Sequence, residues 1–87
     1  MKKYIVSRID VNGYGEITHK LLECWSKEKA EAYVNEQAVY YINNEEYEKS
    51  KVAQSKNYLV LVKLGDQVKF TIEEVEVDDV GAPWNKG

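Results

Sequence analysis

The fold depends most on residues 26–42, SKEKAEAYVNEQAVYYI. Ser26 is a favoured N-cap residue, because its hydroxyl can accept a hydrogen bond from a backbone N–H group in the first helical turn. The residues that follow include neither Gly nor Pro. Their apolar members recur at helical spacing and form one stripe: Ala30, Tyr33, Val34, Ala38, Tyr41 and Ile42. We predict one amphipathic helix over residues 27–42 that ends near Asn43 and Asn44.

A hairpin is predicted on the C-terminal side of this helix. Residues 58–64 and 68–77 are rich in β-branched and apolar residues, and they flank the turn sequence Gly65-Asp66-Gln67. The length of the turn decides which side chains share a face. A two-residue Gly-Asp turn groups Leu59, Leu61, Phe70 and Ile72, whereas a three-residue turn groups Val60, Val62, Phe70 and Ile72.

The last strand changes its alternation near residue 73. Phe70 and Ile72 have one parity, whereas Val75 and Val77 have the other. A β-bulge adds one residue to a strand and would return all four side chains to one face. We therefore predict a bulge at Glu73-Glu74.

A second hairpin is predicted before the helix. Residues 4–11 are rich in β-branched residues, and residues 16–25 form the return strand. The turn between them contains Asn12-Gly13, a pair that readily adopts the positive φ angles of tight hairpins. Both faces of the return strand are mixed, so its pattern leaves open which face is buried. Residues 45–57 are polar and are predicted to form a mobile, partly helical connection.

These elements predict an α+β fold with the order ββαββ, in which one helix packs on one face of a mostly antiparallel sheet. Residues 1–80 would form the single domain, and residues 81–87 would form a flexible C-terminal tail. The chain has 87 residues. A domain of this size buries only about 60–65% of its unfolded surface, so a deep substrate cavity is not expected.

The composition limits where the chain can be located and what it can bind. Lys and Arg number 12 against 15 Asp and Glu, which gives a net charge of −3 and argues against nucleic-acid binding. No apolar run approaches the about 20 residues that span a bilayer, and the first residues do not resemble a signal peptide. Cys24 is the one cysteine, which excludes an internal disulfide. We therefore expect a cytoplasmic protein without membrane contact.

The residues that could carry chemistry do not combine into a known catalytic or metal-binding pattern. His19 and Cys24 are an odd number of positions apart on one predicted strand, so their side chains leave opposite faces unless a bulge intervenes. No zinc-ligand spacing and no glycine-rich phosphate motif is present in the sequence. We expect no catalytic residue, no metal and no cofactor, and hence no enzyme.

Two groups of residues are candidates for binding a partner. The aromatic candidates lie where a small core has no room for them, and aromatic side chains are enriched at recognition surfaces. They are Tyr40, Tyr47 and Trp84. The acidic candidates lie close together and could complement a basic surface: Glu73, Glu74, Glu76, Asp78 and Asp79. The alternative interpretation of the acidic run is an edge strand whose charges prevent aggregation. A calcium site at Asp78 and Asp79 lacks the ligand ladder of an EF-hand.

The sequence therefore predicts a non-enzymatic binding protein that acts through protein–protein contacts, with another protein or another copy of itself as the partner. An inhibitor of a host system, of the kind that phages and mobile elements encode, fits this class. One alternative is an oligomer that binds or sequesters a nucleotide-like small ligand between its protomers, since a small core cannot enclose such a ligand. Another alternative is a structural or assembly subunit that makes its contacts through a sheet edge.

Overall fold

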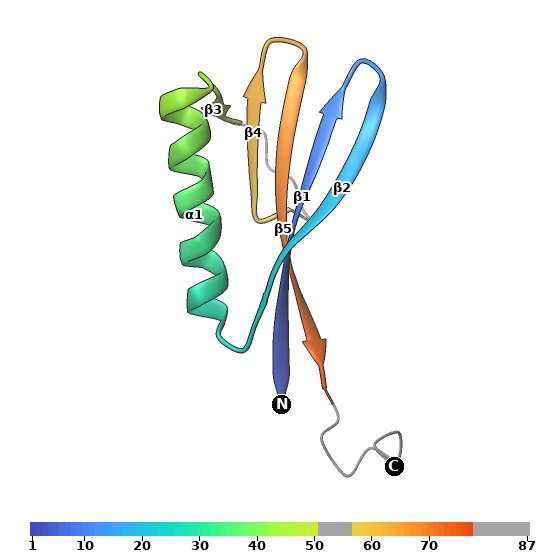
Figure 1. Cartoon of the computed structure of the whole chain (residues 1–87), viewed down its shortest axis with the longest axis vertical. Coiled ribbons are helices and arrows are strands. Elements are labelled where there is room, and N and C mark those ends of the chain that lie inside the picture. Colours follow the sequence, from blue (N-terminus) through green and yellow to red (C-terminus); the bar gives the residue numbers. More distant parts are fainter. Residues whose placement is uncertain (51–56, 78–87) are drawn as a thin grey trace.

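The computed structural model describes residues 1–50 and 57–77. These residues form one helix and a five-stranded antiparallel sheet, which confirms the predicted α+β class (Figure 1). The elements are β1 (Lys2–Asn12), β2 (Gly15–Cys24), α1 (Lys27–Asn44), β3 (Glu48–Lys49), β4 (Leu59–Lys63) and β5 (Asp66–Glu76). The predicted tail, together with Asp78, Asp79 and Trp84, lies outside the described residues.

The strand order is β2-β1-β5-β4-β3. The two predicted hairpins, β1–β2 and β4–β5, therefore lie side by side, and β1 pairs with β5 at the centre of the sheet. This central ladder runs without interruption from Lys2 opposite Glu76 to Val11 opposite Gln67. The short strand β3 pairs with β4 inside residues 45–57, which the sequence predicted to form a mobile, partly helical connection. Residues 51–56 of that connection lie outside the described residues. Glu46, just before β3, has a φ of 62° and turns the chain out of the helix.

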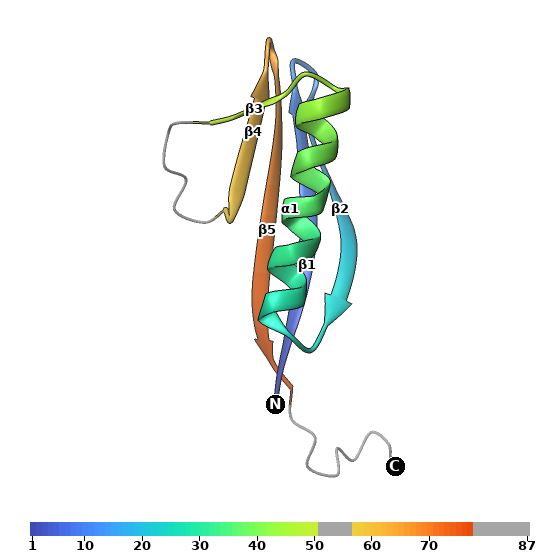
Figure 2. The same ribbon diagram turned by 90° about the vertical axis from the view of Figure 1, so that its left-hand side faces the viewer.

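Helix α1 lies on one face of the sheet (Figure 2). Its N-cap is Ser26, whose hydroxyl oxygen accepts a hydrogen bond from the Lys29 backbone N–H at 3.3 Å. The three residues that α1 buries completely or nearly so are small: Ala30, Val34 and Ala38. Small side chains let the helix approach the sheet closely, so the core is compact. Against them pack Val6, Leu61, Val68 and Phe70 from the sheet.

The β4–β5 turn has two residues, which is the shorter of the two turn lengths that the sequence allowed. Lys63 pairs with Asp66, so the turn residues are Leu64 and Gly65, one position earlier than predicted. Gly65 adopts a φ of 81°, a conformation that costs other residues energy. The helix face of the hairpin carries Leu59, Leu61, Phe70 and Ile72, as the two-residue turn predicts.

The bulge predicted in the last strand is absent, and that prediction was wrong. The β1–β5 register shows no shift, so Val75 lies on the sheet face opposite to Phe70 and Ile72. Because α1 covers one face, the strand does not need to bring every apolar residue to the same side. The irregularity of the described sheet lies in β2 instead, where Leu22 pairs with Val6 but Lys20 pairs with Ser7. The extra residue is Leu21.

This bulge explains the mixed pattern of β2. Leu21 and Leu22 are neighbours in sequence, yet both pack against the core. A regular strand would have sent one of them to the opposite face. The bulge also increases the local twist, which turns the end of β2 toward the start of α1. The face of β2 that the sequence left open is thus half-buried near Leu21 and Leu22 and exposed over residues 15–20.

Candidate functional site

Strand β5 is longer than its neighbour β4, and this difference leaves half of β5 with one open side. β4 begins at Leu59, which pairs with Phe70. The backbone N–H of Tyr58 also donates to the Phe70 carbonyl at 2.8 Å, and this bond ends the contact between the two strands. Among the described residues, positions 71–76 pair with β1 alone. We call these six positions the open half of β5.

The ladder fixes which backbone groups point to the open side. The N–H of Val77 donates to the Met1 carbonyl at 2.8 Å. Hydrogen-bonded pairs alternate along an antiparallel ladder, so residues 71, 73 and 75 direct their N–H and C=O groups toward β1. Those of Ile72 and Glu74 point away from β1, in the direction that β4 no longer occupies. Such groups can pair with an added strand.

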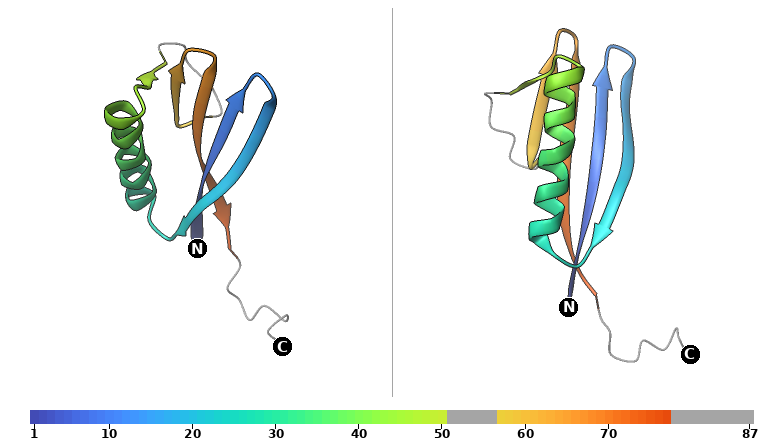
Figure 3. Two further views of the ribbon diagram at one scale, coloured as in Figure 1. Left: turned by 45° about the horizontal axis from the view of Figure 1, so that its top comes forward. Right: turned by 60° about the vertical axis from the view of Figure 1, so that its left-hand side comes forward.

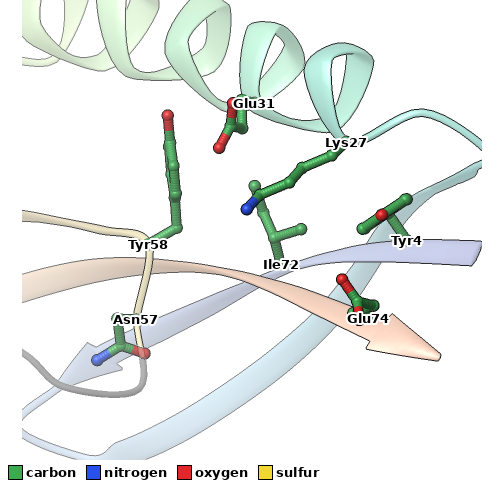
Figure 4. A pocket seen from close by; sticks show the side chains of 7 residues that line it. All are labelled: Tyr4, Lys27, Glu31, Asn57, Tyr58, Ile72 and Glu74. Carbon is green, nitrogen blue, oxygen red and sulfur yellow. The ribbon is translucent and has the colours of Figure 1, made fainter.

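A cavity of about 320 Å³ adjoins the open half of β5. It lies between the first turns of α1, the start of β4 and the ends of β1 and β5 (Figure 4). Its lining residues are Tyr4, Lys27, Glu31, Asn57, Tyr58, Ile72 and Glu74. This volume is at the lower limit of small-molecule sites, so one side chain or a similarly small group fits it better than a whole cofactor.

The charges around the cavity differ in how they are paired. The Glu74 carboxylate forms an ion pair with the Lys2 ammonium at 3.1 Å, and the hydrogen bond and charge of Glu74 raise the pKa of Lys2. Within the described residues, Glu31 and Lys27 form no ion pair. Figure 4 shows Tyr58 rising toward the helix, with the Glu31 carboxylate facing it. The cavity thus combines an aromatic ring, an available carboxylate and the apolar side chain of Ile72.

The acidic residues predicted as one binding surface are divided between two faces of the sheet. Glu74 lines the cavity on the helix face. Glu76 lies at the end of the same face, where its carboxylate pairs with the N-terminal ammonium of Met1 at 2.9 Å. Glu73 pairs with Ile5 in the ladder and therefore points to the opposite face. The structure brings only Glu74 of these described acids to the cavity.

The two predicted aromatic residues that the structure describes lie near the other end of α1. Tyr40 is 53% exposed, and its ring meets Tyr41 edge to face at 5.8 Å between centroids. Tyr47 is half-buried against Tyr41 at 5.4 Å, and the Lys63 ammonium lies over its ring. Thirteen helical positions separate Lys27 from Tyr40, which corresponds to roughly 20 Å. Tyr40 and Tyr47 are therefore remote from the cavity.

The bulge in β2 overturns the expectation that His19 and Cys24 leave opposite faces. His19 pairs with Arg8 and Cys24 with Tyr4, so both point to the helix face. They still lie about 16 Å apart along the strand, at about 3.3 Å per residue. The Cys24 thiol donates to the Ser26 carbonyl at 3.2 Å.

His19 belongs to a different charged group on the same face. Its Nε2 lies 3.3 Å from an Asp10 carboxylate oxygen, and the other oxygen lies 3.0 Å from Arg8 Nε. No group of three or more His, Cys, Asp and Glu residues that could hold a metal ion exists within residues 1–50 and 57–77.

Glu74 is the only residue of the cavity that the sequence predicted as a binding residue. The signal that could have found the others is the unequal length of the two strands of the C-terminal hairpin. Predicted strands of seven and ten residues already imply an unpaired end on the longer one. The side chains around that end come from β1, α1, β5 and the segment before β4, and the sequence contains no local pattern that links them.

Comparison of the chain with models of known protein families, with curated proteins and with solved structures gave no match. In the part of the chain that the structure describes, no helix has the length and apolar character needed to cross a membrane. The site must therefore be interpreted from its own geometry.

Proposed function

We propose that this chain is a non-enzymatic protein-binding module that receives an extended segment of a partner along the open half of β5. The observation that carries this proposal is the pair of outward-facing backbone positions, Ile72 and Glu74, next to a cavity large enough for one side chain. Backbone hydrogen bonds to an added strand supply affinity, and pockets for alternate side chains supply specificity. Both parts of that arrangement are present here.

The chemistry of the cavity favours a lysine or arginine side chain of the partner. A cation is attracted to the face of a tyrosine ring and to a carboxylate. Tyr58 and Glu31 offer this pair of groups, and the Lys27 side chain extends from the helix toward Ile72 (Figure 4). The net charge of −3 supports the approach of a basic segment.

A proline substitution tests the backbone contact. The N–H of Glu74 points away from β1, so Glu74→Pro removes a donor that only an added strand would use. We would select binders from a library of random peptides and measure their affinity by calorimetry. Glu74→Pro should weaken binding at least tenfold, while Glu74→Ala should leave it within about threefold. Thermal unfolding of both variants serves as the control for folding.

Hydrogen exchange locates the bound peptide. Binding should slow exchange at the amides of Ile72 and Glu74 and leave the amides of β2 unchanged. Failure to select any binder, equal affinities of Glu74→Pro and Glu74→Ala, or protection confined to another edge would each contradict the proposal.

The preferred side chain has a separate test. Peptides selected by the wild-type chain should be enriched in lysine or arginine at one position, and Glu31→Gln should remove that preference. Lys27→Gln is the matched control, because it changes a charge on the same helix that also lines the cavity. Enrichment of the wild-type peptides in aspartate or glutamate, lost in Lys27→Gln, would contradict the preference for lysine or arginine and assign the recognition to an anionic group of the partner.

A natural partner would be a protein whose function is blocked when its extended basic segment is held. An inhibitor from a phage or mobile element is the class that fits best, and it acts without chemistry of its own. The function as an oligomeric small-ligand binder stays a prediction, for which a ligand-dependent rise in melting temperature is the readout. The function as an assembly subunit also stays a prediction and depends on the outer edge of β2.

A further inference from the structure

Strand β2 forms one border of the sheet, and its outer side has no strand next to it among the described residues. From Gly15 to Lys20 the strand is regular, with Gly15 opposite Asn12 and Lys20 opposite Ser7. The bulge at Leu21 ends this regular part. Edge strands of this length are templates for pairing with another chain.

The ladder again fixes the outward groups. β1 uses its odd-numbered residues to bond with β5, so its even-numbered residues face β2. Their partners are odd-numbered, as in the pairs Arg8–His19 and Asp10–Ile17. The N–H and C=O groups of Glu16, Thr18 and Lys20 therefore point outward, where a second strand could bond to them.

The same three residues also place their side chains on one face, the face opposite to α1. If two β2 strands run antiparallel with Thr18 opposite Thr18 of a second copy, Glu16 lies opposite Lys20 and Lys20 lies opposite Glu16. Opposite charges and threonine pairs both stabilise directly opposed positions. A two-fold symmetric contact repeats each favourable pair. Registers shifted by two residues lose both charge pairs.

We propose that this chain forms a symmetric dimer through antiparallel pairing of its β2 strands in this register. The two five-stranded sheets then become one continuous sheet, and both helices lie on the same face of it. This inference does not depend on the function proposed above, because it uses the opposite edge of the sheet.

The surroundings of β2 leave room for a second copy. Figure 1 and Figure 3 show the turn end of the β1–β2 hairpin standing apart from α1. Ile17 is 61% exposed on the helix face, and in the dimer it lies beside His19 of the second copy. Lys20 is already in contact with Glu23, but Glu23 also pairs with the Lys3 ammonium at 2.8 Å. Glu23 therefore remains paired when Lys20 turns to the second copy.

Charge reversal tests the register directly. The mass of the wild-type chain should shift from monomer to dimer with rising concentration in sedimentation equilibrium. Glu16→Lys and Lys20→Glu each place like charges opposite one another twice, so each should raise the dissociation constant at least about tenfold. An equimolar mixture of these two variants should form a heterodimer, because each then meets the opposite charge. The double variant Glu16→Lys/Lys20→Glu should dimerise like the wild type.

Two further variants separate pairing from folding. Thr18→Pro removes an outward N–H and should give a monomer with a native circular dichroism spectrum, whereas Thr18→Val should keep the dimer. A wild-type chain that stays monomeric at millimolar concentration would overturn the proposal. A dimer that persists equally in Glu16→Lys and Lys20→Glu, with no recovery specific to their mixture, would also overturn it, because the contact would then lie elsewhere.

Discussion

Leu61 and Leu64 show how sharply single positions differ in this small domain. They have the same side chain and lie three residues apart, yet Leu61 is 0% exposed and Leu64 is 100% exposed. Leu61 points from β4 toward α1, where it joins Phe70 and Val68 in the core. Leu64 occupies the hairpin turn. The contribution of a leucine to stability in this domain therefore depends on its position and not on its residue type.

Truncating these two leucines should give opposite results. We expect Leu61→Ala to lower the free energy of unfolding by about 2–5 kcal/mol, because it removes buried contacts and leaves a cavity. Leu64→Ala should change it by less than about 0.5 kcal/mol. Urea denaturation followed by circular dichroism measures both values. Similar losses in the two variants would contradict the placement of Leu61 in the core.

Tyr41 should make the free energy of unfolding depend on pH in alkaline solution. Burial raises the pKa of the Tyr41 hydroxyl above its ordinary value of 10.0, although the charge of Arg8 acts in the opposite direction. The folded chain thus retains this proton more strongly than the unfolded chain. The stabilisation is complete below pH 10 and is lost as the pH rises through the folded pKa.

A phenylalanine variant isolates this contribution. We expect the free energy of unfolding of the wild type to fall more steeply above pH 10 than that of Tyr41→Phe, which cannot ionise. Tyr14→Phe is the matched control, because Tyr14 is fully exposed at the tip of the first hairpin. Chemical denaturation at several pH values measures the slopes. Equal slopes in the wild type and Tyr41→Phe would show that Tyr41 ionises equally in both states.

At the scale of elements, local signals are strongest for α1. The cap, the absence of helix breakers and the apolar stripe predicted its start and its buried side, and the structure extends it by two residues to Asn44. Ser26 provides the hydrogen bond that begins the helix. A single hydroxyl therefore supports the element that covers the sheet.

Removing this cap should weaken the whole domain, because α1 is its only covering layer among the described residues. We expect Ser26→Ala to lower the free energy of unfolding by about 1 kcal/mol, and Ser26→Asp to preserve it, since aspartate also caps helices. The melting temperatures of the two variants provide the comparison. Equal losses in both would mean that the Lys29 N–H finds another acceptor.

The strands were harder to predict than the helix for a physical reason. Alternation specifies which residues share a face, and it correctly grouped Leu59, Leu61, Phe70 and Ile72. It cannot distinguish a bulge from an apolar residue on an uncovered face, so the slip at Val75 was interpreted wrongly and the bulge at Leu21 was missed. Pairing between distant strands depends on contacts that no local window contains.

The candidate site was the least predictable part. Aromatic and clustered acidic residues were predicted to bind a partner, and of these Glu74 lies at the cavity. The remaining lining residues become neighbours only when α1 crosses the sheet beside the start of β4. The open half of β5 exists because β5 is longer than β4, and no single residue in the sequence indicates this difference.

At the scale of the whole molecule, the two edges differ in how they are protected. The β2 edge carries alternating charges and a bulge, whereas the open half of β5 has a helix and a cavity beside it. Between them, β1 and β5 form the longest ladder of the sheet. Stability should therefore be highest at the centre and lowest at the borders.

Hydrogen exchange at low protein concentration should reveal this gradient residue by residue. We expect the slowest exchange at the amides of Val68 and Phe70, which lie in ladders that are paired on both sides. Along β2, Ile17 and His19 should exchange more slowly than Glu16 and Thr18, because only the former point toward β1. Two-dimensional NMR resolves these amides. A uniform rate along β2 would contradict the ladder assignment.

The adjacency of Met1 and Val77 has a mechanical consequence. These residues lie on neighbouring antiparallel strands at the same end of a molecule that is 50 Å long. A force that separates them loads the hydrogen bonds of the β1–β5 ladder one after another, as in opening a zipper, rather than all at once in shear. The domain should therefore yield to small forces when it is pulled at these two points. It should resist much larger forces when it is pulled at Met1 and Gln67, which lie at opposite ends of the same ladder.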